Sequence, residues 1–142
     1  MSPAEAGTMG AVKSWLESRG VRVDRTGNGI LSFEAARDQC LVEIEPAGVV
    51  RCQFGVDLEE LRDLIAGSAT EDLGEDELVR AARYHLQTIA KPYAARLTAG
   101  GFAEEYDVTA EHAVIGYVHP VDLSQPDKVL TVLGRCLEIL GK

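Results

Sequence analysis

The chain has few of the residues on which catalytic and metal-binding sites are usually built. Among 142 residues there are three cysteines, three histidines and one tryptophan, and aromatic residues make up only 6%. The cysteines, Cys40, Cys52 and Cys136, form no CxxC pair, so neither a zinc site nor a dithiol redox motif is encoded. We expect all three to be small buried thiols.

Long apolar runs and excess positive charge are missing as well. No stretch approaches the roughly 18 residues that a membrane span needs, and the start MSPAEAGTMG lacks a charged-then-apolar leader. The formal charge is -9, from 23 acidic and 14 basic residues, and such a charge repels phosphate backbones. We therefore expect a cytoplasmic protein that binds neither membranes nor nucleic acid.

What the chain does contain fits one domain over residues 1–142. Hydrophobic residues make up 46%, which is ordinary for a globular core, and the length is near the commonest domain size. The sequence leaves open whether the first eight residues are ordered.

Hydrophobic periodicity predicts an α+β domain with the element order α-ββββ-α-α-ββ-α. We expect helices at about 5–19, 57–67, 75–97 and from Ser124 onward, with Ser124 as the N-cap of the last helix. Between them we expect a four-stranded meander and a two-stranded hairpin. The helices should lie on one side of this antiparallel sheet.

The stretch DRTGNGILSF, residues 24–33, could be a phosphate-binding loop or a turn. A phosphate loop needs a helix directly after it, whereas a β-rich segment follows here. A three-residue turn at 27–29 makes paired residue numbers sum to 56, which sets Val23 opposite Phe33 and keeps the apolar side chains on one face. We therefore expect a hairpin, with Gly29 in the left-handed conformation.

The stretch CLVEIEPAGVVRCQF predicts a second hairpin in the same way. A turn with Gly48 at its left-handed position makes paired numbers sum to 94. This register places Glu43 opposite Arg51 as a cross-strand charge pair. Cys40 and Cys52 become diagonal neighbours, so a disulfide between them is not favoured.

Two helices should follow the meander. The first begins at Asp57, an N-cap with Glu60 three residues later, and Gly67 should end it. Its apolar stripe consists of Leu58, Leu61, Leu64 and Ile65. The second is the longest element, and Pro92 should kink or weaken its last turn because proline removes one backbone donor.

The C-terminal part is apolar on more than one side. In the strand at 112–119, Ile115 and Tyr117 point one way and Val114 and Val118 the other, as in a strand covered on both faces. The final helix has an apolar face spanning about half of its circumference, wider than the usual stripe. Such a width predicts that this helix meets more than one surface.

Seven side chains are candidates for contact with a partner or with a second copy of the chain. They lie at the edge of the first helix's stripe, on the far face of the long helix, or at the margins of the final helix: Trp15, Arg80, Arg83, Tyr84, Lys91, Leu130 and Ile139. Two alternatives stay open, because a basic helix face can be merely solubilising and a lone tryptophan can belong to the core.

No catalytic, cofactor-binding or metal-binding constellation is legible. His112 and His119 fall on opposite faces of one strand, so they cannot jointly bind a metal there. Glu43 and Glu45 share a strand face, but nothing desolvating surrounds them in the sequence. We interpret them as part of a solvated sheet face.

The layout resembles the type III secretion chaperone-like fold, which includes the Tir chaperone (CesT) family and the YbjN-like proteins. The matching parts are the opening helix GAVKSWLESRG, the meander in VRVDRTGNGILSFEA and QCLVEIEPAGVVRCQF, and the ending HAVIGYVHPVDLSQPDKVLTVLGRCLEIL. The resemblance covers nearly the whole chain. It implies a homodimeric, non-enzymatic protein without a cofactor that binds another polypeptide.

Two differences from the secretion chaperones favour a YbjN-like relative without a secretion client. The chain has four strands before its middle helices, where the secretion chaperones usually have three, and it inserts the helix DLEELRDLIAG. A second hypothesis is a small-molecule-binding domain or an unrecognised enzyme, with a pocket between the sheet and the long helix. The first hypothesis predicts a dimer with exposed apolar patches, and the second predicts a deep cleft.

Overall fold

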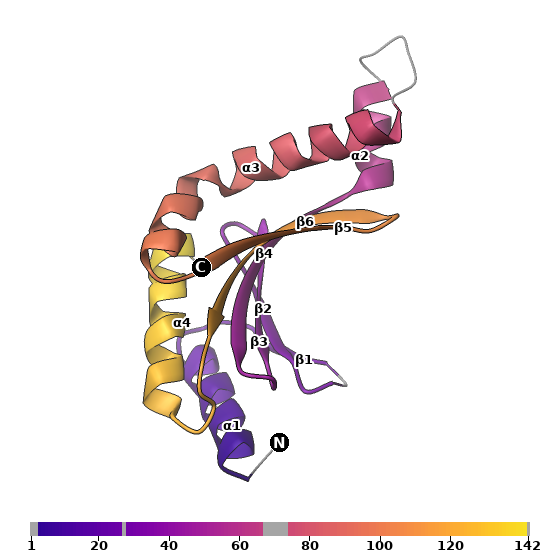
Figure 1. Ribbon diagram of the computed structural model, residues 1–142. Coiled ribbons are helices and arrows are strands. Elements are labelled where there is room, and N and C mark those ends of the chain that lie inside the picture. Colours follow the sequence, from indigo (N-terminus) through magenta and orange to yellow (C-terminus); the bar gives the residue numbers. More distant parts are fainter. Residues whose placement is uncertain (1–2, 27, 67–73, 142) are drawn as a thin grey trace.

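The computed structural model describes residues 3–26, 28–66 and 74–141. In chain order its elements are α1 (Pro3–Ser18), β1 (Asp24–Arg25), β2 (Leu31–Ala35), β3 (Cys40–Glu45), β4 (Val49–Asp57), α2 (Leu58–Ala66), α3 (Glu75–Ala99), β5 (Ala103–Val108), β6 (His112–Pro120) and α4 (Pro126–Leu140). The predicted α+β class and element order are confirmed (Figure 1).

The six strands form one antiparallel sheet in the order β1-β2-β3-β4-β6-β5. Every second side chain of the central strands is buried, because successive side chains of a strand point to opposite faces. The buried apolar side chains of β2, β3, β4 and β6 are Leu31, Phe33, Ala35, Cys40, Val42, Ile44, Val50, Cys52, Phe54, Ala113, Ile115 and Tyr117.

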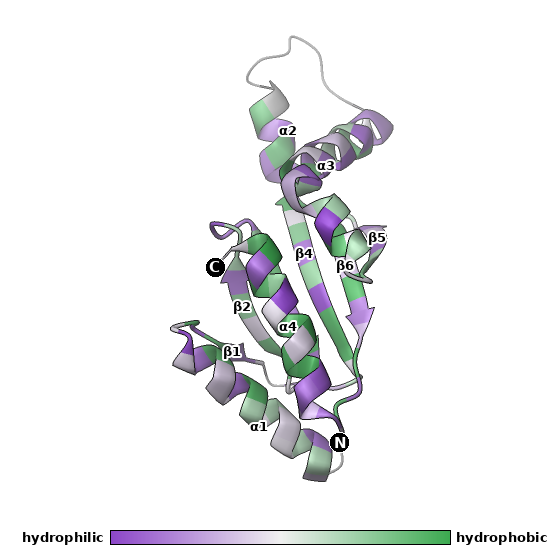
Figure 2. Cartoon of the chain, turned by 90° about the vertical axis from the view of Figure 1, so that its left-hand side faces the viewer, coloured by the Kyte–Doolittle hydropathy of each residue, from purple (hydrophilic) through white to green (hydrophobic). Residues whose placement is uncertain are grey.

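The helices cover only this apolar face, as predicted. α1 and α4 lie side by side over it (Figures 1 and 2). α3 crosses the same face, where the ring of Tyr93 stacks on that of Phe54 at 5.9 Å between centroids. α2 packs against α3 beyond the end of β4. The opposite face of the sheet carries no helix among the described residues, and we call it the open sheet face.

Both predicted hairpin registers are confirmed. Asp24 pairs with Ser32, a sum of 56, and Val42 pairs with Cys52, a sum of 94. The first strand is shorter than expected, because β1 has only two residues and Val23 lies before it.

The ends of several helices differ from the predictions. Ser124 is not the N-cap of α4; that position is Gln125, because the backbone and hydroxyl of Ser124 both donate to Asp122 Oδ1, at 2.9 and 2.6 Å. These bonds lower the pKa of the Asp122 carboxyl. α1 begins at Pro3, so residues 3–8 are helical, and Thr8 is buried.

In α2 the predicted cap is confirmed, because Asp57 Oδ1 accepts the backbone N–H groups of Glu59 and Glu60. Leu64 is 72% exposed, so its assignment to the apolar stripe was wrong. The side chain of Ile65, Gly67 and the acidic connector after it lie outside the described part.

α3 is the longest helix, with 25 residues, and it bends toward its C-terminal end, the part that contains Pro92 (Figure 1). In the described ranges, no helix is both long and apolar enough to cross a bilayer.

The three cysteines are buried and free, as predicted. Cys52 on β4 and Cys136 on α4 bring their sulfur atoms within 3.7 Å of each other. Hydrogen bonding to Cys136 and to Cys40, together with burial, raises the pKa of the Cys52 thiol. The three buried thiols therefore act as packing groups in the core.

The turn between β2 and β3 is strained. Ala36, Arg37 and Asp38 have φ values of 52°, 57° and 66°, although none of them is glycine. Left-handed backbone costs a non-glycine residue on the order of 1 kcal/mol. The backbone N–H of Ala36 donates to the carbonyl of Gly141 at 2.9 Å, which ties this turn to the end of α4.

Two glycines, one in β4 and one in the turn before it, should differ in how much an alanine substitution destabilises the fold. Gly48 has a φ of +92°, and a Cβ there would lie 2.7 Å from the carbonyl oxygen of Val121, whereas a Cβ at Gly55 would meet only ordinary contacts. We expect Gly48→Ala to lower the free energy of unfolding by about 1–3 kcal/mol. Gly55→Ala, the control, should change it by less than about 1 kcal/mol. Urea denaturation measures both changes, and equal effects would contradict the positive-φ constraint at Gly48.

Tyr117 should make the free energy of unfolding decrease at alkaline pH. Its hydroxyl donates to Glu104 Oε2 at 3.0 Å, and burial followed by this bond raises its pKa. The unfolded chain loses the phenolic proton near pH ~10, while the folded protein keeps it, so stability falls above that pH. Tyr117→Phe loses about 1 kcal/mol at pH 7.

We expect this deficit of Tyr117→Phe to shrink by about 1 kcal/mol at pH 11, because the variant has no proton to lose. Urea denaturation at pH 7, 9 and 11 gives the comparison, with Tyr84→Phe as the control for an exposed phenol. A deficit that stays constant with pH would overturn this assignment.

Candidate protein-binding surfaces

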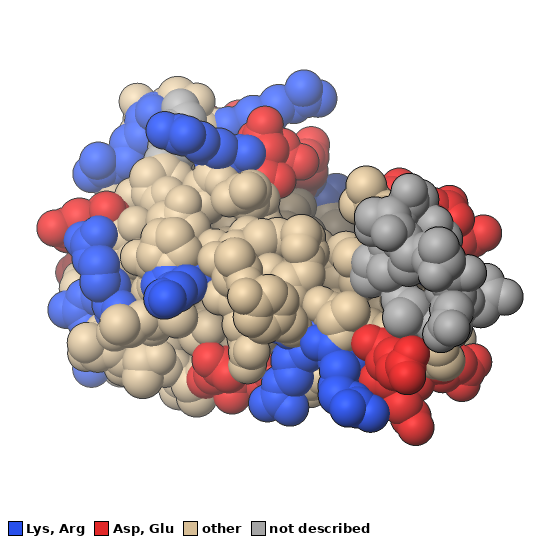
Figure 3. Space-filling model, turned by 90° about the horizontal axis from the view of Figure 1, so that it is seen from above, with Lys and Arg blue, Asp and Glu red and all other residues tan. Residues whose placement is uncertain are grey.

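The predicted contact residues on α3 occupy its outer side. Arg80, Tyr84 and Lys91 are all exposed, and the ring of Tyr84 is 74% exposed. Glu77, Tyr84 and Lys91 are spaced by seven residues, so they lie close to one line along the helix. We call this line the outer row of α3. Viewed from above, the outer surface has a largely uncharged centre with basic and acidic side chains around it (Figure 3).

Arg83 differs from its neighbours on α3. Its guanidinium lies over the ring of Tyr106 on β5, 5.1 Å from the ring centroid. Arg83 is exposed, but its guanidinium packs on the domain itself. Burial raises the pKa of Tyr106, with Arg83 opposing that shift. The Tyr106 hydroxyl is buried and makes no hydrogen bond within the described residues.

The other predicted contact residues lie on α1 and α4 and do not join the α3 group. Ile139 is only 8% exposed and belongs to the core, so it is not available for a partner. Leu130 is half-buried against the same core. Trp15 is half-buried next to Gly134, with the Arg19 guanidinium 4.1 Å from its ring centroid.

Trp15 also lines a hollow of about 610 Å³ between α1 and α4, with Arg135 on the far wall. Arg135 donates to the carbonyl of Gly100 at 3.1 Å, so it is held by the end of α3. The Trp15 indole therefore packs between α1 and α4.

The open sheet face was not among the predicted sites. Its outward side chains follow from the confirmed registers. Apart from Asp57, which caps α2, its strands carry one arginine, Arg51, and six carboxylates: Asp24, Glu34, Glu43, Glu45, Glu105 and Asp107. The face is thus strongly acidic.

Arg51 is the cationic centre of this face. It donates to Glu45 on the adjacent strand β3 and, across β6, to Glu105 on β5, both at 2.9 Å. The predicted register partner of Arg51, Glu43, instead accepts a hydrogen bond from Gln53. The charge pair predicted between Glu43 and Arg51 is therefore wrong, although their pairing in the sheet is right.

Gly116 has no side chain, which leaves space on β6 for the Glu105 side chain that pairs with Arg51. A Cβ at Gly116 would lie 3.2 Å from Glu105 Cγ, so the glutamate side chain rests on this bare stretch of β6. Val114 and Val118, on either side of Gly116, are half-exposed on the open sheet face. The prediction that this strand is covered on both faces was wrong, because charged side chains rather than a helix shield its second face.

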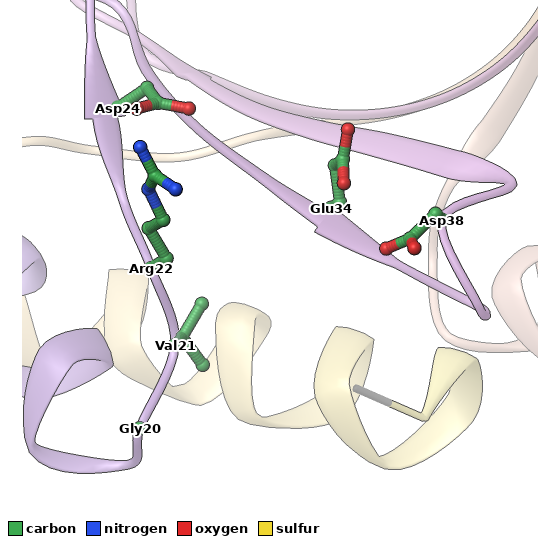
Figure 4. A pocket seen from close by; sticks show the side chains of 6 residues that line it. All are labelled: Gly20, Val21, Arg22, Asp24, Glu34 and Asp38. Carbon is green, nitrogen blue, oxygen red and sulfur yellow. The ribbon is translucent and has the colours of Figure 1, made fainter.

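Two hollows lie toward opposite edges of the open sheet face. One, of about 470 Å³, is lined by Gly20, Val21, Arg22, Asp24, Glu34 and Asp38. Arg22 and Asp24 stand on one side of it, with Glu34 and Asp38 on the other (Figure 4). The second, of about 320 Å³, is lined by Arg51, Gln53, Glu105, Tyr106, Asp107 and Val114.

The predicted small-molecule pocket between sheet and long helix coincides with packed aromatic rings. Phe54 stacks on Tyr93 and meets the Tyr117 ring edge-on at 6.4 Å. A mainly apolar hollow of about 300 Å³ lies elsewhere, between the end of β6 and α4, with His119 and Lys128 in its lining.

Two of the three histidines, His112 and His119, have separate partners. His119 Nδ1 donates to the carbonyl of Pro120 at 2.7 Å, and His112 lies 3.7 Å from Asp57. In the part of the chain that the structure describes, no cluster of His, Cys, Asp and Glu has an arrangement that could hold a metal ion.

Comparisons of the chain with protein-family models, with curated proteins and with solved structures found no match in any of the three.

Removing Arg51 should lower the free energy of unfolding, because the carboxylates around it would then repel one another. We expect Arg51→Met to lower the free energy of unfolding by about 0.5–1 kcal/mol in low salt, because two ion pairs are lost. The loss should shrink in 0.5 M NaCl, since salt screens exposed charges. Urea denaturation at both salt concentrations tests this, with the exposed Arg25→Met as the control. A loss that does not depend on salt would mean that Arg51 acts by packing alone.

Proposed function

We propose that this chain is a non-enzymatic, cytoplasmic protein-binding domain of the chaperone-like or regulatory kind, similar to the YbjN-like proteins, which works as a homodimer. The observation that carries the proposal is the pair of free surfaces on opposite sides of the domain. One is the outer row of α3, and the other is the open sheet face. The proposal assigns no catalytic residue.

The outer row of α3 is suited to pairing with a second copy. In an antiparallel contact about a two-fold axis at Tyr84, Glu77 of one chain lies opposite Lys91 of the other, because both are seven residues from the axis. A two-fold contact makes each such pair twice. The exposed Tyr84 rings would meet at the centre, and aromatic side chains are enriched in such positions.

This dimer leaves both open sheet faces accessible. α3 lies on the helix-covered side, so a contact through its outer row turns the open sheet faces away from each other. A client polypeptide then has a free surface on each protomer. The alternative of a small-molecule-binding domain remains a prediction, and the hollow beside His119 and Lys128 is the place to examine for it.

Charge reversal at the outer row should control dimerisation. We expect a dimer by light scattering on a size-exclusion column, and Lys91→Glu to raise its dissociation constant roughly tenfold, because two attractive pairs become repulsive. Adding Glu77→Lys to Lys91→Glu restores opposite charges and should restore the dimer.

The control is Arg25→Glu, which makes the same charge change on β1, far from α3 (Figure 1). It should leave the dimer intact. A wild-type mass that stays monomeric at every concentration would refute the dimer, and failure of the double variant to recover would refute this interface.

A further inference from the structure

We propose that the open sheet face binds an extended, basic polypeptide segment that crosses the strands. The inference rests on the proposed function and names the class of client.

One row of outward side chains runs straight across the sheet. In the observed registers Glu34 pairs with Leu41, Leu41 with Gln53, Gln53 with Gly116, and Gly116 with Glu105. The row therefore has a carboxylate at each end and less polar, flatter positions between them. Leu41 is 40% exposed, one of the few large apolar side chains left open to solvent.

The length of this row sets the length of the segment. Four inter-strand steps separate β2 from β5, which makes roughly 19 Å at about 4.8 Å per step. An extended chain advances about 3.3 Å per residue, so roughly six residue steps span the row. Side chains at positions 1, 3, 5 and 7 of such a segment face the sheet. Positions 1 and 7 then reach the two ends.

The charges at both ends select cations. The first hollow has three carboxylates, Asp24, Glu34 and Asp38, against the one guanidinium of Arg22. The second has Glu105 and Asp107 against Arg51. Arg51 already forms ion pairs with Glu45 and Glu105, whereas Glu34 and Asp107 form no ion pair in the described structure. A lysine or arginine at each end of the segment would complete these sites, and the apolar side chains between them would lie over Leu41.

The matched probe is a fluorescein-labelled peptide, Lys-Thr-Val-Thr-Val-Thr-Lys, with cations at positions 1 and 7. We expect fluorescence anisotropy to detect saturable binding that weakens about tenfold between 50 and 300 mM NaCl, because salt screens these contacts. The peptide with threonine in place of both lysines should bind at least about tenfold more weakly.

Two double variants distinguish the face from net charge. Glu34→Gln with Asp107→Asn removes one carboxylate at each end of the face and should weaken binding about tenfold. Glu17→Gln with Glu138→Gln makes the same charge change at exposed positions of α1 and α4 and should leave binding unchanged. Thermal unfolding confirms that both variants fold.

The outcomes separate this inference from the proposed function. Equal weakening by both double variants, or no binding of the lysine peptide, would overturn the basic-segment site. Equal binding of the lysine and threonine peptides would also overturn it, while leaving polypeptide binding in place. Light scattering reports the dimer independently of all these results.

Discussion

The alternation of apolar and polar side chains along β2, β3, β4 and β6 is the constraint on which the rest of the molecule depends. Because every second side chain is apolar, only one face of the sheet needs cover, and α1, α3 and α4 all lie there. Most of the hydrophobic burial that stabilises the domain comes from this single interface. The other face is free to carry charge, which is why function is sought there and on the outer side of α3.

The same alternation explains how far the sequence alone predicts the structure. The turn glycines and the apolar pattern determine the two hairpin registers, because a shift by one residue would turn every side chain to the wrong face. Leu64 was misassigned because its exposure depends on tertiary packing. Ser124 was misassigned because it donates to the Asp122 carboxylate instead of capping α4. The apolar periodicity of the sequence contains neither kind of information.

The candidate surfaces were predictable to different degrees. Arg80, Tyr84 and Lys91 follow from the periodicity of one helix, so the sequence indicates their exposure directly. The transverse row ending at Glu34 and Glu105 depends on the pairing of β4 with β6, two strands separated in the chain by α2, α3 and β5. No local pattern encodes that pairing.

The buried thiols have a practical consequence. Cys40, Cys52 and Cys136 are the only cysteines of the chain, and all lie between the sheet and α4. A thiol-reactive reagent can reach them only when α4 separates from β4 or the domain opens further. Their rate of alkylation therefore reports the frequency of core opening in the native protein, without any engineered label.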